Sequence, residues 1–264
     1  MKTKNVVAGL GEIGMPIFKL ISKNNICVGY DKNTKLMDSS SFEKYSSLPT
    51  KFLHVCIPFT KNFISNVLSL EKLFKPDCIV IHSTIKPYTT QKIQSKTNTP
   101  IIYSATRGVH KRMLFDLKRY TKFFAIEKNI KNKKSISNSF SKLMKKSKVK
   151  TKQMSEPLTL ELAKIVCDTS YYGWLINYAQ MSKMITMKHN VDYDEMWTFS
   201  DEIHDYLGNR PKMFPGIIGG HCVLPNLELI ENDTLNMIKS INKQFNTKTL
   251  KKGKLKHEQK RKTH

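Results

Sequence analysis

The sequence lacks the features that define three classes of protein. Its five cysteines (Cys27, Cys56, Cys78, Cys167 and Cys222) contain no CxxC pair, which is unlike a disulfide framework or a zinc site, so we expect no bound metal. No apolar run approaches the roughly 18–20 residues that a membrane span needs. The N-terminus leads directly into a glycine turn, which is unlike a signal peptide. These absences favour a soluble protein of the reducing cytoplasm.

Acidic residues are also scarce. The chain has 21 Asp and Glu against 45 Lys and Arg, a formal net charge of +24. Ten lysines and no acid lie within residues 128–152, and eight Lys or Arg accompany Glu258 alone within residues 248–264. Such runs are typical of solvated faces and of a loose tail, so we expect residues 248–264 to be disordered; an anionic partner is the alternative. No recognition module or aromatic-interleaved basic patch is present, and a nucleic acid is therefore not expected as the partner.

A glycine pattern stands at the start of the chain. A short apolar run, residues 5–9, ends in Gly9-x-Gly11-x-x-Gly14; a helix is predicted at residues 13–22 and a second strand at residues 26–30, closed by Asp31. This order and spacing are typical of a dinucleotide site, because the glycines permit a tight turn, close approach of a pyrophosphate and packing of helix on strand. Asp31 would accept hydrogen bonds from the adenosine ribose and favours NAD over NADP, although the neighbouring Lys32 weakens this preference. A glycine turn without a ligand is the alternative.

Strand-like and helix-like segments continue to alternate. Further strands are predicted at residues 52–57, 78–82, 100–104, 122–126 and 149–154, and helices at residues 62–74 and 135–146. This alternation predicts an α/β fold with a doubly wound, mostly parallel Rossmann-type sheet over residues 1–154. Ligands of such sheets bind at the carboxyl ends of the strands, where Thr60, Ser83, Thr84 and Arg107 are expected.

A long helix is predicted at residues 156–190, within an all-α domain that spans residues 155–247. Its apolar residues spread beyond one stripe, which predicts burial on more than one side and a homodimer formed through this helix. Lys164 and Asp168 are four residues apart and should share a face, with Tyr171 and Tyr172 one turn further on. A second helix is expected at residues 191–207, capped by Asp192 or Asp194.

A loop around a His-Cys pair follows that second helix. Gly219 and Gly220 precede His221 and Cys222, so that the backbone can approach a ligand closely while presenting a thiol. A neighbouring cation, either His221 or Lys164, would raise the thiolate fraction of Cys222. A purely structural turn is the alternative for this loop taken alone.

Four segments occur together in an informative order: Gly9-Leu-Gly-Glu-Ile-Gly14-Met-Pro16, Ile81-His-Ser83-Thr84 with Thr89-Thr90, Glu161-Leu-Ala-Lys164, and Gly216-Ile-Ile-Gly-Gly-His-Cys222. Together they resemble the UDP-glucose/GDP-mannose (nucleotide-sugar) dehydrogenase family, over residues 4 to 230. The resemblance implies an enzyme that uses NAD to oxidise the C6 alcohol of a sugar twice, to the carboxylate.

The resemblance also assigns roles to residues. Cys222 would be the nucleophile that traps the aldehyde, Lys164 would stabilise the oxyanion, and Thr84 would lie near the cofactor and the reacting water; the long helix would be the dimerisation element. The full catalytic set it implies is Cys222, Lys164, Asp168, Thr84 and His221. The implied cofactor contacts are Gly9, Gly11, Glu12, Ile13, Gly14, Asp31, Lys32, Pro58 and Thr84, and the implied substrate contacts are Arg107, Gly219, Gly220 and Asn226.

The chain departs from the family pattern at four places. Asp168 replaces a catalytic asparagine, Asn226 replaces an aspartate, and Thr106 replaces the glutamate assigned to thioester hydrolysis. Only about forty residues follow Cys222, so the resemblance is to a shortened form without the C-terminal nucleotide-sugar-binding domain. Either the substrate is smaller, or a partner chain supplies the missing wall, or turnover is lost.

Two other interpretations remain open. A β-hydroxyacid dehydrogenase has a similar length, pairs a dinucleotide domain with a helical domain and places a lysine on its first long helix, but needs no Gly-Gly-His-Cys loop. A regulatory or scaffold protein that binds NAD without turnover is the other.

Overall fold

The computed structural model describes residues 2–207, 215–219, 223–229, 231 and 233–261. The chain divides into two compact units, Met1–Lys164 and Ile165–His264. From the sequence, this division is expected after residue 154. The first unit extends further because helix α7 (Pro157–Ala163) packs on the sheet and on a neighbouring helix, α4 (Thr89–Gln94).

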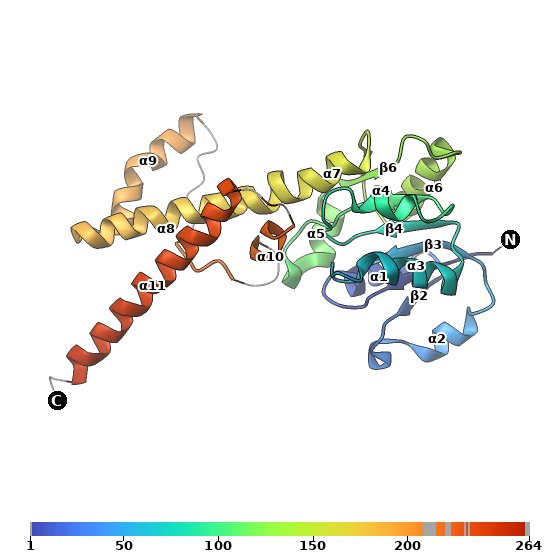
Figure 1. Cartoon of the computed structure of the whole chain (residues 1–264), viewed down its shortest axis with the longest axis horizontal. Coiled ribbons are helices and arrows are strands. Elements are labelled where there is room, and N and C mark those ends of the chain that lie inside the picture. Colours follow the sequence, from blue (N-terminus) through green and yellow to red (C-terminus); the bar gives the residue numbers. More distant parts are fainter. Residues whose placement is uncertain (1, 208–214, 220–222, 230, 232, 262–264) are drawn as a thin grey trace. The chain divides into compact units, whose positions relative to one another are not determined.

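A seven-stranded sheet forms the centre of the first unit (Figure 1). The strands are β1 (Lys4–Ala8), β2 (Cys27–Tyr30), β3 (Thr50–Val55), β4 (Cys78–Ile81), β5 (Ile101–Tyr103), β6 (Lys122–Ile126) and β7 (Thr151–Gln153), in the order β2-β1-β3-β4-β5-β6-β7. All neighbouring pairs are parallel except β5 and β6. The prediction of a mostly parallel Rossmann-type sheet is confirmed, and each predicted strand overlaps an observed one.

Helices cover both faces of this sheet. On one face, α1 (Gly14–Ser22), α5 (Met113–Arg119) and α6 (Lys133–Lys146) enclose a core that includes Ile17, Phe124 and Phe140. On the other face, α2 (Ser39–Lys44), α3 (Phe63–Phe74), α4 and α7 enclose a second core, which includes Phe63 and Ile79. The central strands are buried on both sides, which explains their continuous apolar sequences. Two short 3₁₀ turns, η1 (Thr34–Leu36) and η2 (His110–Arg112), complete the unit.

The predicted continuous helix at residues 156–190 is wrong in one respect. A π-helical segment, η3 (Lys164–Ser170), separates α7 from α8 (Tyr171–His189). The hydroxyl groups of Thr169 and Ser170 donate to the carbonyl oxygen of Ile165 at 3.0 and 2.7 Å. These side-chain hydrogen bonds compete with the regular i→i−4 backbone pattern, which accounts for the wider turn.

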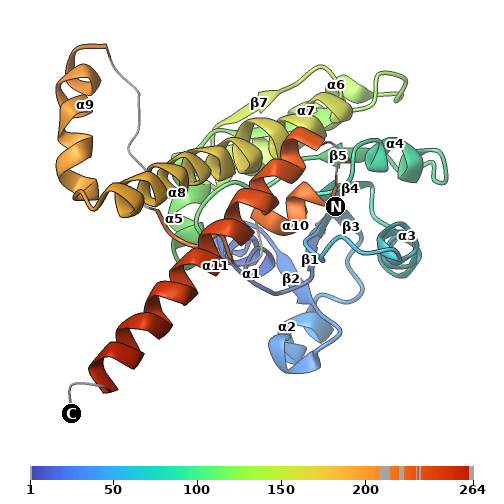
Figure 2. The ribbon, with the colours of Figure 1, turned by 60° about the vertical axis from the view of Figure 1, so that its left-hand side comes forward.

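The second unit is helical, as predicted. It consists of α8, α9 (Tyr193–Leu207), α10 (Val223–Leu227) and α11 (Asp233–Arg261), and α8 and α11 lie side by side (Figure 2). A Cβ atom on Gly173 of α8 would lie 3.1 Å from Val223 and 3.3 Å from Ile238, so this glycine permits the close packing of three helices. Asp192 caps α9 by accepting a hydrogen bond from the Glu195 N–H group at 2.8 Å, as expected.

The last helix includes most of the segment that the sequence analysis expects to be a tail. Helix α11 continues to Arg261, although disorder is expected from residue 248. Of the described helices, none is long and apolar enough to cross a membrane.

Candidate active site

The three glycines of the turn between β1 and α1 have different surroundings. Gly9 has φ +89°, a conformation that side chains other than glycine rarely adopt. A Cβ atom on Gly14 would lie 1.6 Å from the Gly9 carbonyl oxygen and 3.1 Å from the Cys56 Cβ atom. A Cβ atom on Gly11 would meet nothing within 4 Å. Gly9 and Gly14 are therefore fixed by the fold, whereas Gly11 faces open space.

This turn fits the pyrophosphate of a dinucleotide. Helix α1 begins at Gly14 without a hydrogen bond from a capping side chain, and Ile13 occupies the N-cap position. The first N–H groups of such a helix, together with its dipole, favour an anion. The open space at Gly11 is where a phosphate would approach the backbone, since a side chain there would fill it.

Asp31 is held at the carboxyl end of β2. One oxygen of its carboxylate accepts a hydrogen bond from Leu10 N–H at 2.7 Å, and the other accepts from Asn33 N–H at 2.8 Å. The carboxylate thus fixes the glycine turn itself, a role that the sequence analysis does not include. Each oxygen retains a lone pair for a ribose hydroxyl group. Lys32 beside it is exposed.

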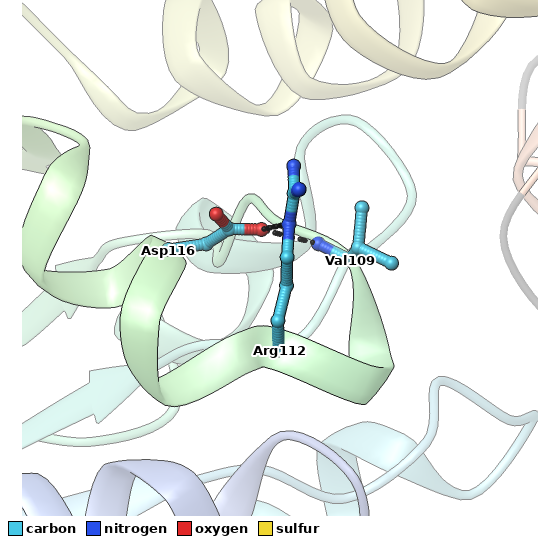
Figure 3. Close-up of polar contacts among 3 residues, drawn as sticks. All are labelled: Val109, Arg112 and Asp116. Atoms are coloured by element: carbon cyan, nitrogen blue, oxygen red, sulfur yellow. Dashed lines mark hydrogen bonds and ion pairs between the residues drawn. The ribbon is translucent and has the colours of Figure 1, made fainter.

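The loop after β5 contacts the glycine turn. His110 Nδ1 lies 2.7 Å from Glu12 Oε2. The buried carboxylate of Asp116 supports this loop by accepting hydrogen bonds from Val109 N–H at 2.9 Å and from Arg112 Nε at 3.1 Å (Figure 3). The hydrogen bond from Val109 is the main cause that lowers the pKa of Asp116. No motif in the sequence indicates this support.

Other predicted residues lie at the carboxyl ends of the strands. The Ser83 hydroxyl group donates to the Ile57 carbonyl oxygen at 2.5 Å, which joins the loops that follow β3 and β4. Thr84 is half-buried beside it, and Pro58 is exposed. The Arg107 guanidinium donates to the Thr121 carbonyl oxygen at 2.8 Å. Within the first unit, the structure therefore brings Thr84, Pro58 and Arg107 to the same edge as the glycine turn.

Glu161 attaches the helix that carries Lys164. Its buried carboxylate accepts hydrogen bonds from Tyr88 N–H at 2.7 Å, Thr90 N–H at 2.9 Å and the Thr90 hydroxyl group at 2.6 Å. Burial raises the pKa of Glu161, and these hydrogen bonds oppose that effect. Because the carboxylate caps the N-terminus of α4, it holds α7 against the sheet, with Lys164 at the start of the π-helical segment. The spacing of Lys164 and Asp168 thus lies within a π-helix, where hydrogen bonds join residues five apart.

Two histidines lie buried beneath this edge. His54 Nδ1 and His82 Nε2 are 2.9 Å apart, and the rings stack with centroids 5.2 Å apart. Burial, with a smaller effect of the Lys122 charge, lowers the pKa of His54 to about 3, and burial lowers the pKa of His82 well below its ordinary value. Both rings are therefore neutral near pH 7. In the part of the chain that the structure describes, no three or more His, Cys, Asp or Glu side chains are grouped so as to hold a metal ion.

In the second unit, two amides fix the start of the Gly-Gly-His-Cys loop. Asn242 accepts a hydrogen bond from Ile218 N–H at 2.8 Å and donates to the Ile218 carbonyl oxygen at 3.1 Å. Gln180 donates to the Gly216 carbonyl oxygen at 2.6 Å and to Asn242 at 3.0 Å. This network is buried, and the sequence gives no motif for it.

Two of the predicted residues in and after this loop, Gly219 and Asn226, lie within the described part of the chain. Gly219 is exposed, and Asn226 in α10 is buried. Gly220, His221 and Cys222 lie outside the described residues.

The lysine-rich segment forms an exposed surface at the end of the sheet opposite β2. An open hollow of about 680 Å³ is lined by lysines of α6 and of the approach to β7, among them Lys142, Lys145 and Lys150. None of the described residues that line the hollow carries a carboxylate. The hollow lies beside the edge strand β7, whereas the glycine turn follows β1. It has the character of a solvated face, as the sequence predicts.

No family model matches the sequence, and no curated protein matches it. The fold, a Rossmann-type sheet followed by a helical unit, is nevertheless shared with solved dehydrogenase structures.

The solved structures that share this fold include dehydrogenases of two kinds. UDP-D-ManNAc dehydrogenase from Pyrococcus horikoshii matches with a TM-score of 0.74 and 16% identity, over 92% of this chain and 69% of that chain. UDP-N-acetyl-mannosamine dehydrogenase from Staphylococcus aureus matches with a TM-score of 0.72 and 16% identity, over 96% and 70%. A 3-hydroxyisobutyrate dehydrogenase from Mycobacterium tuberculosis matches with a TM-score of 0.67 and 14% identity, over 93% and 94%. At these identities the likeness establishes the fold, and at that level the resemblance to nucleotide-sugar dehydrogenases is confirmed.

Proposed function

We propose that this chain is an NAD-dependent oxidoreductase that acts on a CH–OH group. The observation that carries this proposal is the glycine turn, in which Gly9 and Gly14 are fixed by close backbone contacts while Gly11 faces open space at an uncapped helix N-terminus. NAD, when bound, accepts the hydride. The chain's own contribution is to hold the pyrophosphate on the N–H groups of α1 and the ribose on Asp31.

The substrate chemistry that fits best is that of a nucleotide-sugar 6-dehydrogenase. The thiolate of Cys222 would form a C–S bond with the aldehyde carbon, and the charge that develops on the carbonyl oxygen would be stabilised by Lys164. Arg107, Gly219, Gly220 and Asn226 would bind the substrate. After the second oxidation, water would cleave the thioester, releasing the carboxylate and the thiol.

Thioester cleavage would be the slow step. General acid–base assistance is worth roughly 10²–10⁴-fold, and Thr106 cannot supply it in the way that a glutamate does. An initial burst of NADH followed by slower turnover is therefore expected.

A β-hydroxyacid dehydrogenase is the second candidate. It is favoured by the match to 3-hydroxyisobutyrate dehydrogenase, which covers nearly the full length of both chains. In that case the substrate would be a small hydroxy acid, Lys164 would remain the catalytic lysine, and Cys222 would be dispensable.

Cofactor binding can be tested apart from turnover. Gly11→Val fills the space that the pyrophosphate would occupy, while nothing within 4 Å of the new Cβ atom opposes it. We expect calorimetry to show NAD binding by the parent chain and at least a tenfold loss of affinity in Gly11→Val. Gly219→Val is the matched control, because a Cβ atom there also has no described residue within 4 Å but lies in the other unit, and the variant should bind NAD as the parent does. Equal affinities of Gly11→Val and the parent would contradict the proposed site.

Turnover tests the chemistry. NADH formation should be followed across a panel of UDP-sugars, GDP-mannose and small 3-hydroxy acids, with Cys222→Ala and Lys164→Ala beside the parent. Two NADH per nucleotide sugar, lost in Cys222→Ala, would support the four-electron route. Turnover of a hydroxy acid that survives Cys222→Ala would support the second candidate, and NAD binding without any turnover would identify a non-catalytic protein.

A homodimer through α8 forms part of this proposal. Tyr171, Tyr178 and Ile185 follow one another at seven-residue intervals on α8 and are 56%, 58% and 50% exposed. An apolar stripe at this spacing is suited to pairing with a second helix. Light scattering should give the mass of a dimer for the parent chain and that of a monomer for Tyr178→Glu with Ile185→Glu. An unchanged mass in the double variant would exclude this stripe as the interface.

A further inference from the structure

A buried lysine holds the loop that follows β5. Lys122 is the first residue of β6 and is only 6% exposed. Its Nζ atom donates hydrogen bonds to the carbonyl oxygens of Ser104 and Ala105 at 2.8 and 3.3 Å, and to the Thr106 hydroxyl oxygen at 3.0 Å. An ammonium group has three N–H donors, so each donor has one acceptor in this loop.

Further contacts attach the same loop to β6 and to the residue before it. Arg107 donates to the Thr121 carbonyl oxygen at 2.8 Å, and its guanidinium carbon lies 4.9 Å from the centroid of the Phe123 ring. Ser104 adds a hydrogen bond from its hydroxyl group to the Phe123 carbonyl oxygen at 2.8 Å. Residues 104–107 and 121–123 therefore form a clasp, in which Lys122 fixes the backbone from which Arg107 extends.

Among the residues that the structure describes, no acid is paired with the charge of Lys122. Its three acceptors are neutral oxygens, and it takes part in none of the ion pairs among the described residues. Five titratable or charged groups interact electrostatically with Lys122. They come from β3, from the loops after β3, β4 and β5, and from the start of η3: His54, Cys56, His82, Arg107 and Lys164.

Of the buried groups in this cluster, Lys122 changes charge near neutral pH. Burial lowers the pKa of Lys122 to about 7. The next largest effect, that of Cys56, raises this pKa, and the Lys164 and Arg107 charges lower it. Burial raises the pKa of Cys56 to about 12 and lowers that of His54 to about 3, so neither changes charge there. A deprotonated Lys122 would have two N–H donors for three acceptors.

We propose that Lys122 is a positioning residue for the proposed dehydrogenase, and that it holds residues 104–107 so that Arg107 is placed to bind the substrate. This role rests on the proposed function. When Lys122 loses its proton, one of its acceptors loses its donor, the loop is held less firmly and the substrate is bound more weakly. The NAD site is fixed by other residues and keeps its affinity.

The first test does not depend on activity. In the full chain with ¹³C-labelled lysine, Lys122 is assigned by its loss in Lys122→Met, and its side chain should titrate near pH 7. The Arg107 Nε resonance should shift with the same midpoint in the parent and show no such shift in Lys122→Met. A Lys122 that titrates near 10, or an Arg107 signal that does not follow it, overturns the proposal whether or not a substrate is known.

The second test uses the nucleotide sugar or hydroxy acid that the parent oxidises. In the parent, KM should rise at least fivefold from pH 6 to pH 8.5 with kcat changed less than twofold; in Lys122→Met, KM should be high at both pH values. Lys145→Met, which replaces an exposed lysine of α6, should behave as the parent. Thr106→Val removes one acceptor of Lys122 without altering the lysine, and it should also raise KM. This variant replaces Lys122→Met in the test if Lys122→Met does not fold.

The outcomes separate the two proposals. A KM that is the same in Lys122→Met and the parent overturns the role of Lys122 and leaves the dehydrogenase standing. Absence of turnover with every compound overturns the proposed function and, with it, this role. Unchanged NAD affinity in Lys122→Met is expected, and a tenfold loss would mean that the lysine supports the fold as a whole.

Discussion

Replacing Lys122 by methionine should remove a pH dependence from the stability of the sheet unit. The ammonium group is buried and bonded only to neutral oxygens. Methionine has a similar length and carries no charge, so it does not titrate. The variant loses three hydrogen bonds, and its absolute stability will differ from that of the parent; the informative quantity is the change of that difference with pH.

The magnitude follows from the pKa of this one group. Burial lowers it from 10.5 to about 7, so between these pH values the unfolded chain binds a proton that the folded chain does not. Stability therefore rises with pH across this window, by up to about 1.4 kcal/mol per pH unit. The whole free-energy cost of burying the charged lysine, about 5 kcal/mol, is present below pH 7 and is absent above pH 10.5. From about pH 7 to about pH 8.5, the parent should gain about 2 kcal/mol relative to Lys122→Met.

The assay is urea unfolding of the full chain at these two pH values, followed by far-ultraviolet circular dichroism. Both tryptophans, Trp174 and Trp197, lie in the helical unit, so their fluorescence reports that unit separately. The upper limit stays below pH 9, because burial raises the pKa values of the Cys27 and Cys78 thiols in the folded chain. At higher pH the thiols of the unfolded chain would lose their protons first, and this would lower the stability of both proteins. Lys145→Met should follow the parent. Parallel stability curves for the parent and Lys122→Met would refute the reasoning.

Two further predictions concern the remaining fixed points of the site. Gly14→Ala should lower the free energy of unfolding of the sheet unit by about 3 kcal/mol or more, because its Cβ atom would meet the Gly9 carbonyl oxygen. Gly11→Ala should change this free energy by less than about 0.5 kcal/mol. Equal effects of the two variants in urea titrations would contradict the geometry of the turn. Asn242→Ala should destabilise the helical unit by about 2–3 kcal/mol, because it removes the Asn242 hydrogen bonds to buried groups of Ile218 and Gln180. Urea unfolding followed by tryptophan fluorescence measures this loss of stability, and a loss well below about 2 kcal/mol would mean that water replaces the amide.

The sheet could be predicted from the sequence because its signals are local. Apolar runs bounded by glycine, proline or polar residues mark each strand, and the spacing of Gly9, Gly11 and Gly14 requires a tight turn wherever the rest of the chain goes. The position of Asp31 after the second strand is equally local. Its use as an anchor for Leu10 N–H is not, since that contact depends on how the two strands align.

Other features depend on contacts between distant parts of the chain. Lys122 is one lysine among many in a basic sequence, and only the pairing of β5 with β6 places it beneath Thr106. Glu161 is recognisable as part of a motif, but its function as a cap for α4 requires Thr90 to lie opposite it. The π-helical segment that begins at Lys164 arises because the Thr169 and Ser170 hydroxyl groups compete with backbone N–H groups for the Ile165 carbonyl oxygen. The pattern of apolar residues does not predict this competition.

The choice between the two dehydrogenase candidates rests on chemistry rather than on the fold. Solved structures of both kinds share this architecture at 18% identity or less, and Lys164 is the proposed catalytic lysine in both candidates. What differs is the need for a covalent thiol adduct, because a four-electron oxidation must hold the aldehyde between two hydride transfers, whereas a two-electron oxidation need not. Cys222 is therefore the residue whose removal separates the candidates, and the number of NADH molecules formed per substrate measures the same difference from the side of the product.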